Sequence, residues 1–182
     1  MNQGLIPSRY AKALYEYAAA QGEDSRIFEL MEKLSVSFRT EPGLLKATVN
    51  PFIPAVDKVE LLVTAAGPGA GEDAVYKQFL RLLVDNGRLD AVRDIALAYL
   101  KLFRVRHNIR LVTVCSASPL DSAEEKRLKA LISRHLDGAS IDYRTEVDPD
   151  LIGGFTVSVD NEKLDASVEG ELKQLRLSLL SK

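Results

Sequence analysis

The chain has 182 residues, of which 46% are hydrophobic and 27% are charged, and its formal net charge is -2. This composition is typical of a globular protein with one large domain or two small ones, and it excludes a disordered or fibrous chain. The near-neutral charge gives no reason to expect nucleic acid as the main partner.

The compartment is indicated by cysteine usage and by the absence of targeting signals. Cys115 is the sole cysteine, so a disulfide within the chain is impossible, which suits a reducing compartment. The first residues lack the basic segment and apolar core of a secretory signal, and the uncharged stretches are too short and too broken by Gly and Pro to cross a bilayer. We therefore expect a cytoplasmic protein that would be held at a membrane only by something else.

Apolar residues recur at helical spacing throughout the first half. We expect helices over residues 8–20, 24–39, 44–49, 55–66, 73–86 and 89–106. Ser8 and Gly22 are the expected N-cap and stop signal of the first helix. Short loops between such helices imply antiparallel neighbours in one bundle.

The second, fourth, fifth and sixth predicted helices each present one apolar face to the expected core. These faces consist of Ile27, Leu30, Met31, Leu34 and Phe38; Val59, Leu62 and Val63; Val75, Tyr76, Phe79, Leu82 and Leu83; and Val92, Ile95, Ala96, Tyr99 and Phe103.

The first predicted helix carries more apolar surface than one face of a bundle needs. Its two apolar rows are Tyr10, Ala13, Leu14, Tyr17 and Ala18, and Ala11, Tyr15 and Ala19. Either both rows belong to the core, or one of them forms a groove that binds a partner helix.

The second half changes to the alternating period of strands. We expect strands over residues 110–116, 141–147 and 155–159 and near Leu164, a helix opened by the Asp121–Glu124 capping box and closed by Gly138, and a last helix from residues 165–167 onward. The fold class predicted is therefore mainly α, with an N-terminal helical bundle over residues 1–107 and a small α+β domain, with a short sheet and two helices, over residues 108–182.

Asp148, Pro149, Gly153 and Gly154 indicate a tight turn, because Pro restricts φ and Gly permits positive φ. We expect this turn to join the second and third strands as a hairpin. It only faintly resembles a calcium loop, since Ile152 and Val159 occupy positions where acidic ligands are required.

The residue types needed for catalysis are sparse. His135 lies among apolar positions near the C-terminus of its helix, so we expect a histidine that is either packed or facing the helix dipole. His107 lies in a polar segment and Cys115 in an apolar strand, so we expect a solvated histidine and a buried inert thiol. We predict no catalytic residue, no metal site and no cofactor. The cations between Lys101 and Arg110 could contact phosphates, but they are better explained by the negative end of the helix that finishes there.

Four motifs, in order along the chain, carry a family resemblance. They are Arg9-Tyr-Ala-Lys-Ala-Leu14, Asn86-Gly-Arg-Leu89, Ser116-Ala-x-Pro-Leu120, and Asp148-Pro-Asp-Leu-Ile-Gly-Gly-Phe155 followed by Asp165-x-Ser-Val168 and leucines. Together they resemble the delta subunit of the bacterial F-type ATP synthase, whose mitochondrial counterpart is the oligomycin-sensitivity-conferring protein. Ala166, Glu169 and Glu171 depart from the family, where Gly and basic residues are common.

This resemblance implies a non-catalytic stator subunit that links the catalytic head to the peripheral stalk, so that proton-driven rotation is coupled to ATP synthesis. It implies a six-helix N-terminal domain that binds the N-terminal helix of an alpha subunit, a second domain that meets the C-terminal end of the b subunits, and a peripheral location at the cytoplasmic face of the inner (plasma) membrane. Its groove falls on Tyr10, Ala13, Leu14, Gln78, Phe79 and Leu82.

Three other interpretations remain: an unrelated helical adaptor with an appended α+β module, an enzyme using the carboxylates from Asp148 to Asp165, and a nucleic-acid binder using the cations from Lys101 to Arg110.

Overall fold

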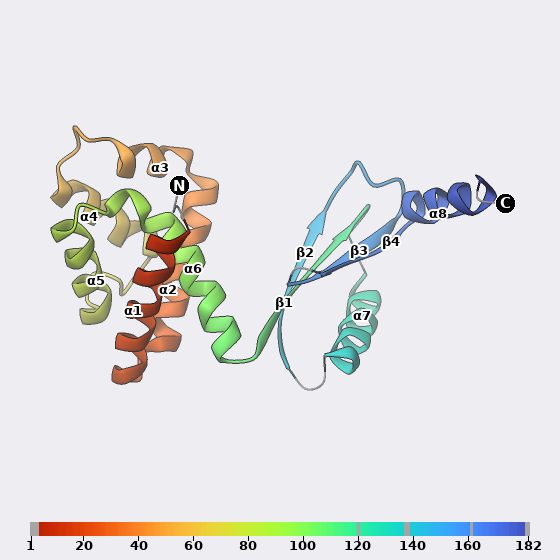
Figure 1. Cartoon of the computed structure of the whole chain (residues 1–182), viewed down its shortest axis with the longest axis horizontal. Coiled ribbons are helices and arrows are strands. Elements are labelled where there is room, and N and C mark those ends of the chain that lie inside the picture. The colour runs from red at the N-terminus through yellow and green to blue at the C-terminus, as the bar shows by residue number, and fades with distance from the viewer. Residues whose placement is uncertain (1–3, 120, 137–138, 161, 181–182) are drawn as a thin grey trace. The chain divides into compact units, whose positions relative to one another are not determined.

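The computed structural model describes residues 4–119, 121–136, 139–160 and 162–180 (Figure 1). The chain divides into two compact units, Met1–Phe103 and Arg104–Lys182, whereas the change of sequence period lies a few residues later, at 107/108. Several residues used in the predictions are not described: Leu120, Gly138 and Asn161, the last expected in the turn before the strand near Leu164. The side chains of His135, Glu171 and Leu175 are not described either, Leu175 being expected in the apolar row of the last helix.

The first unit is helical, as its periodicity predicts. Its elements are α1 (Leu5–Gln21), α2 (Asp24–Thr40), α3 (Pro42–Val49), α4 (Ala55–Ala66), α5 (Ala74–Asp85), the 3-10 turn η1 (Leu89–Ala91) and α6 (Val92–Arg106), which runs past the unit boundary.

The predicted start of α1 is wrong, and its predicted end is confirmed. The helix begins at Leu5, and the Ser8 hydroxyl donates a 2.7 Å hydrogen bond back to the Gly4 carbonyl, so Ser8 is inside the helix instead of capping it. Gly22 terminates the helix with φ of 72°, a left-handed conformation that glycine adopts without a steric penalty.

The central helix α2 has the predicted inward face, because Ile27, Leu30, Met31, Leu34 and Phe38 are all buried. It packs against α1, α3 and α4. Aromatic rings extend this core: Phe28 stacks on Phe103 with ring centroids 4.3 Å apart. The Tyr99 hydroxyl is tied down by a 3.0 Å bond to the carbonyl of Asp24.

The start of α5 is fixed by a buried carboxylate. One oxygen of Asp73 accepts a 2.8 Å hydrogen bond from the backbone amide of Tyr76, so Asp73 is the N-cap. Its other oxygen lies 2.9 Å from Nε of Arg26 on α2. The buried hydroxyl of Tyr76 in turn donates to the Leu62 carbonyl on α4, at 3.1 Å. Three helices therefore meet at this point.

The second unit combines a four-stranded sheet with two helices. Its elements are β1 (Ile109–Ser116), α7 (Ser122–His135), β2 (Ser140–Val147), β3 (Gly154–Val159), β4 (Glu162–Ser167) and α8 (Val168–Leu180). The strand order is β2-β1-β3-β4, with β1 parallel to β2 and antiparallel to β3.

Helix α7 connects the parallel pair β1 and β2 and covers one face of the sheet (Figure 1). Ile132 of α7 packs with Val112, Val114 and Val157 of the sheet. The backbone amide of Asp121 donates to the Glu124 carboxylate at 3.2 Å, which is the return half of the predicted capping box. Val112 and Val114, which alternate along β1, thus form part of the core of this unit.

The predicted hairpin between the second and third strands is wrong. β2 and β3 lie on opposite sides of β1, so the segment from Asp148 to Gly153 passes the end of β1 instead of turning tightly between neighbours. The Asp148 amide donates to the Ser116 carbonyl at the end of β1, at 3.0 Å. The actual hairpin joins β3 to β4 near Asp160, whose φ is 51°.

Within the described residues, no helix combines the length and apolar character that a bilayer crossing requires.

Candidate partner-binding site

Helix α1 keeps apolar side chains outside the core. Its buried stripe is Pro7, Ala11, Leu14 and Ala18, which combines members of both predicted rows. Tyr10 is half-buried, whereas Ala13 and Tyr17 are exposed. A helix in a monomeric bundle normally exposes polar residues at these positions, so this row is apolar surface that the core of the unit does not use.

Helix α5 also has an apolar side chain outside the core, that of Leu82. Phe79 and Leu83 are buried, but Leu82 between them along the helix is 44% exposed. Leu82 lines one hollow of about 440 Å³ together with Tyr10 and Ala13 of α1, and this hollow is here called the α1–α5 groove. Its lining residues are Ile6, Arg9, Tyr10, Ala13, Leu82 and Arg88.

The six residues predicted for the groove occupy three kinds of position. Tyr10, Ala13 and Leu82 line it. Leu14 and Phe79 are each 4% exposed and belong to the core. Gln78 accepts a 2.8 Å hydrogen bond from the hydroxyl of Tyr17, which joins α5 directly to α1.

Three further residues line this groove and were not among the six predicted: Ile6, Arg9 and Arg88. Arg9 and Arg88 both lie in motifs that carry the family resemblance, so the signal was present. Ile6 was missed because the helix was expected to begin only at Ser8.

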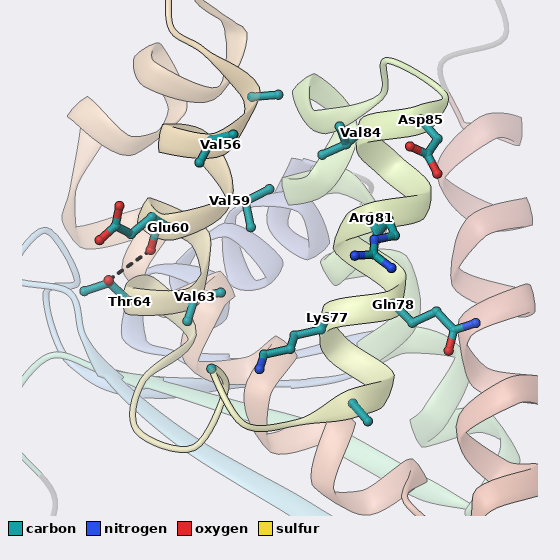
Figure 2. Close-up of a pocket in the computed structure, with 13 residues that line it drawn as sticks. Val56, Val59, Glu60, Val63, Thr64, Lys77, Gln78, Arg81, Val84 and Asp85 are labelled. Carbon is teal, nitrogen blue, oxygen red and sulfur yellow. Dashed lines mark hydrogen bonds between the residues drawn. The ribbon is translucent and has the colours of Figure 1, made fainter.

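A second hollow lies on the other side of α5 and was not predicted. It has a volume of about 1230 Å³ and is called the α4–α5 pocket. Figure 2 shows Val56, Val59 and Val63 of α4 on one side and Lys77, Arg81 and Val84 of α5 on the other. Val59 and Val63, expected in the core, are half-buried and line this pocket, so that prediction is corrected.

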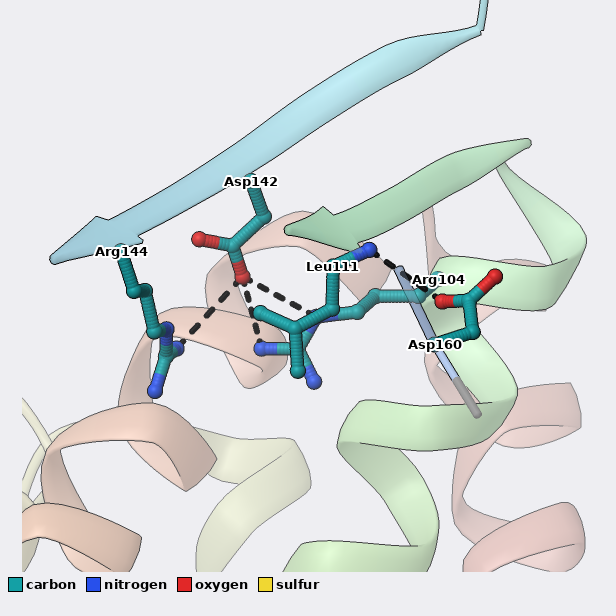
Figure 3. A network of polar contacts seen from close by, with 5 residues as sticks. All are labelled: Arg104, Leu111, Asp142, Arg144 and Asp160. Carbon is teal, nitrogen blue, oxygen red and sulfur yellow. Dashed lines mark hydrogen bonds and ion pairs between the residues drawn. The ribbon is translucent and has the colours of Figure 1, made fainter. Parts of the chain in front are cut away.

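The cations expected near the end of α6 are partly neutralised by Asp142 of β2 and by Asp160, which follows β3. Arg104 contacts one carboxylate oxygen of Asp142 twice, at 2.8 and 3.1 Å, and Arg144 approaches the same oxygen at 3.5 Å (Figure 3). Arg110 pairs with Asp160 at 2.8 Å. This arrangement uses the cations inside the fold and leaves fewer of them for phosphate binding.

The model of the family described as ATP synthase delta (OSCP) subunit matches residues 6–179. The chain belongs to this family.

Relatives of known family match this chain along almost its whole length. The chain is 34% identical to ATP synthase subunit delta of Parabacteroides distasonis, over 99% of this chain and 98% of the relative. It is 32% identical to the same subunit of Bacteroides thetaiotaomicron, over 100% and 97%, and 33% identical to that of Bacillus velezensis, over 98% and 97%. The chain is therefore a delta subunit component of an F-type ATP synthase, within its stator.

The fold is shared with a solved complex. A chain in the cryo-EM structure of the Toxoplasma gondii mitochondrial ATP synthase hexamer matches with a TM-score of 0.74 and 18% identity, covering 96% of this chain and 97% of that chain. At this identity the match shows a common fold.

The delta-family motif at the C-terminal end forms one packed junction. The Val168 amide donates to the Gly153 carbonyl at 3.0 Å, which ties the start of α8 to the Gly-Gly pair. Gly154 has φ of 78°, and a Cβ there would collide with the carbonyl oxygen of Ala166. Gly154 is thus required by the close approach of its backbone to the β4–α8 junction.

The carboxylates of this delta-subunit motif shape the backbone. Asp148 accepts from the Asp150 amide at 3.0 Å, and Asp165 accepts from the Ser167 amide at 2.9 Å. The side-chain and backbone hydrogen bonds from Ser167 lower the pKa of the Asp165 carboxyl. Over the described part of the chain, no three His, Cys, Asp or Glu side chains cluster as metal ligands, and Cys115 is half-buried in β1.

Proposed function

We propose that this delta-family subunit mechanically links the catalytic head of the ATP synthase to its peripheral stalk and performs no chemistry itself. In this proposal, residues 1–107 bind the N-terminal helix of an alpha subunit, and residues 108–182 meet the C-terminal end of the b subunits. The link prevents the head from turning with the rotor, so that proton-driven rotation is coupled to ATP synthesis. No cofactor takes part.

The observation that supports head binding is the apolar α1–α5 groove. Tyr10, Ala13 and Leu82 line it without being part of the core, and Leu82 remains 44% exposed. Burying such side chains against an apolar helix face contributes about 25 cal/mol per Å² of apolar surface removed from water. A few buried anchors dominate interfaces of this kind, so Leu82 is the expected anchor.

The family match overturns the interpretation of the chain as an unrelated helical adaptor. The hydrogen bonds of Asp148 and Asp165 argue against an enzyme, because both carboxylates serve backbone turns. The ion pairs of Arg104 and Arg110 argue against a nucleic-acid binder, because both cations already face carboxylates of the fold.

The test is a calorimetric titration of a peptide spanning the alpha subunit N-terminus into the full chain and its variants. Leu82→Asp or Ala13→Asp places a charge in the apolar groove and should weaken binding by about 2 kcal/mol or more, roughly thirtyfold. Both side chains are exposed in the free protein, so circular dichroism should show an unchanged fold.

Leu97→Asp is the matched control, because Leu97 on α6 is 46% exposed and does not line the groove. Equal affinities for wild type, Leu82→Asp and Leu97→Asp would contradict the assignment of the groove.

A further inference from the structure

The α1–α5 groove is lined mainly by apolar side chains, and the charged side chains that line it are basic. Its two charged lining residues are Arg9 and Arg88, and no carboxylate of the described residues lines it. The chain as a whole is slightly acidic, with a net charge of -2. The basic character is therefore a local property of this groove.

The α4–α5 pocket shows that an apolar hollow in this unit need not be basic. Its lining includes Lys77 and Arg81 but also Glu60 and Asp85, so its charges balance. Helix α5 thus borders one hollow that is neutral and another that carries two arginines.

Arg9 lies on the partner-facing side of α1. Ile6, Arg9, Tyr10 and Ala13 follow the spacing i, i+3, i+4 and i+7, which places them on one face of the helix. Arg88 follows the end of α5, on the segment that leads into η1. Both side chains are exposed, and among the described residues neither has an ion pair with a carboxylate within 4.0 Å.

A helix that covers this groove removes water from both guanidinium groups. Desolvating a charge is unfavourable unless an opposite charge and its hydrogen bonds replace the water. A carboxylate is the best replacement, because it accepts two parallel hydrogen bonds from one guanidinium group. A basic or purely apolar helix would leave both arginines uncompensated.

We propose that the helix bound in the α1–α5 groove carries acidic side chains flanking its apolar row, and that Arg9 and Arg88 select it by pairing with these carboxylates. This rests on the proposed function, in which the helix comes from an alpha subunit. Leu82, Tyr10 and Ala13 supply the affinity through burial, and the two arginines supply discrimination against helices of other charge.

The test uses the full chain and a synthetic peptide of the alpha subunit N-terminus, titrated at about 50 mM and about 500 mM salt. Arg9→Gln and Arg88→Gln should each weaken binding by roughly three- to tenfold at low salt, with a smaller effect at high salt. Arg81→Gln is the matched control, because it removes the same charge from α5 on the side of the other pocket. A second peptide with its Glu and Asp residues replaced by Gln and Asn should bind more weakly to wild type and be insensitive to Arg9→Gln.

The outcomes separate this proposal from the one on which it rests. If wild type binds and Leu82→Asp does not, but Arg9→Gln and Arg88→Gln bind like wild type, the charge pairing is overturned and the groove assignment stands. If Arg81→Gln weakens binding as much as Arg88→Gln, the effect is general electrostatics and the pairing is overturned. If the peptide fails to bind wild type, both proposals are overturned.

Discussion

Gly170 in the first turn of α8 is packed directly against the carboxylate of Asp165. A Cβ added to Gly170 would lie 2.9 Å from Cγ of Asp165 and 3.0 Å from each of its oxygens. The same carboxylate accepts from the Ser167 amide, and the Ser167 hydroxyl accepts from the Gly170 amide at 3.1 Å. These two hydrogen bonds hold the end of β4 against the start of α8. In this arrangement only glycine, which has no Cβ, fits at position 170.

Replacing Gly170 with Ala should therefore lower the stability of the second unit. Elsewhere in a helix, Gly→Ala stabilises by about 1 kcal/mol, but here Asp165 has to move and lose its bond to Ser167. In an Asp165→Ala background the obstacle is gone, and Gly170→Ala should become stabilising. Thermal unfolding of wild type, both single variants and the double variant measures this change of sign; a destabilisation that persists without the Asp165 carboxylate would contradict the explanation.

The hydrogen bonds from Ser167 to Asp165 predict that the stability of the fold depends on pH in the acid range. The pKa of Asp165 is below its ordinary value of 3.8 in the folded chain, because side-chain and backbone hydrogen bonds to Ser167 favour the charged form. Because the pKa of Asp165 is lower in the folded than in the unfolded chain, its carboxylate stabilises the fold at pH values above the unfolded pKa. This contribution is lost as the pH falls through the folded pKa. The melting-temperature difference between wild type and Asp165→Asn should be constant down to about pH 5 and shrink below pH 3.8. A difference that grows on acidification would have the wrong sign.

Asp73 should be the most sensitive polar residue of the helical unit. Its side chain is 1% exposed, caps α5 and pairs with Arg26. Asp73→Ala removes the cap and the ion pair and should reduce the free energy of unfolding by about 2–3 kcal/mol. Asp73→Asn keeps an acceptor for the Tyr76 amide and should cost about 1 kcal/mol less than Asp73→Ala. Urea denaturation measures both, and equal losses would show that the cap contributes nothing.

The two arginines that contact Asp142 should differ in energetic weight. The Arg104 side chain is 12% exposed and lies 2.8 Å from Asp142, whereas Arg144 is 35% exposed and lies 3.5 Å away (Figure 3). Asp142→Ala should cost about 2–3 kcal/mol, because it removes the carboxylate that compensates a nearly buried guanidinium group. Arg144→Ala should cost under about 1 kcal/mol, as expected of a solvent-screened pair. Because Asp142→Ala removes both contacts and Arg144→Ala removes only one, similar losses for the two variants in urea denaturation would show that the buried Arg104 contact contributes little.

Local patterns were sufficient for much of the secondary structure. The inward face of α2 and the bounds of α4 follow from the helical spacing of apolar residues. Gly22 ends α1 for a reason confined to one residue, its access to positive φ. In the groove, Tyr10 and Ala13 belong to a row of α1 that exceeds what one core face uses, and the family resemblance added Leu82.

The strand connections and the choice of buried helix faces were decided by contacts between segments distant in the sequence. The turn chemistry of Asp148–Gly154 is compatible with a hairpin, but the parallel pairing of β1 with β2 leaves β3 the opposite edge of β1, so the same residues make a longer connection. Likewise, the packing of α2 and α5 against α1 decides which row of α1 is buried. Leu14 and Phe79 are buried in the core, whereas Ile6, Arg9 and Arg88 line the groove. Periodicity identifies apolar faces, but burial is a competition among all faces for one core, and that competition is settled only when the helices and strands pack together.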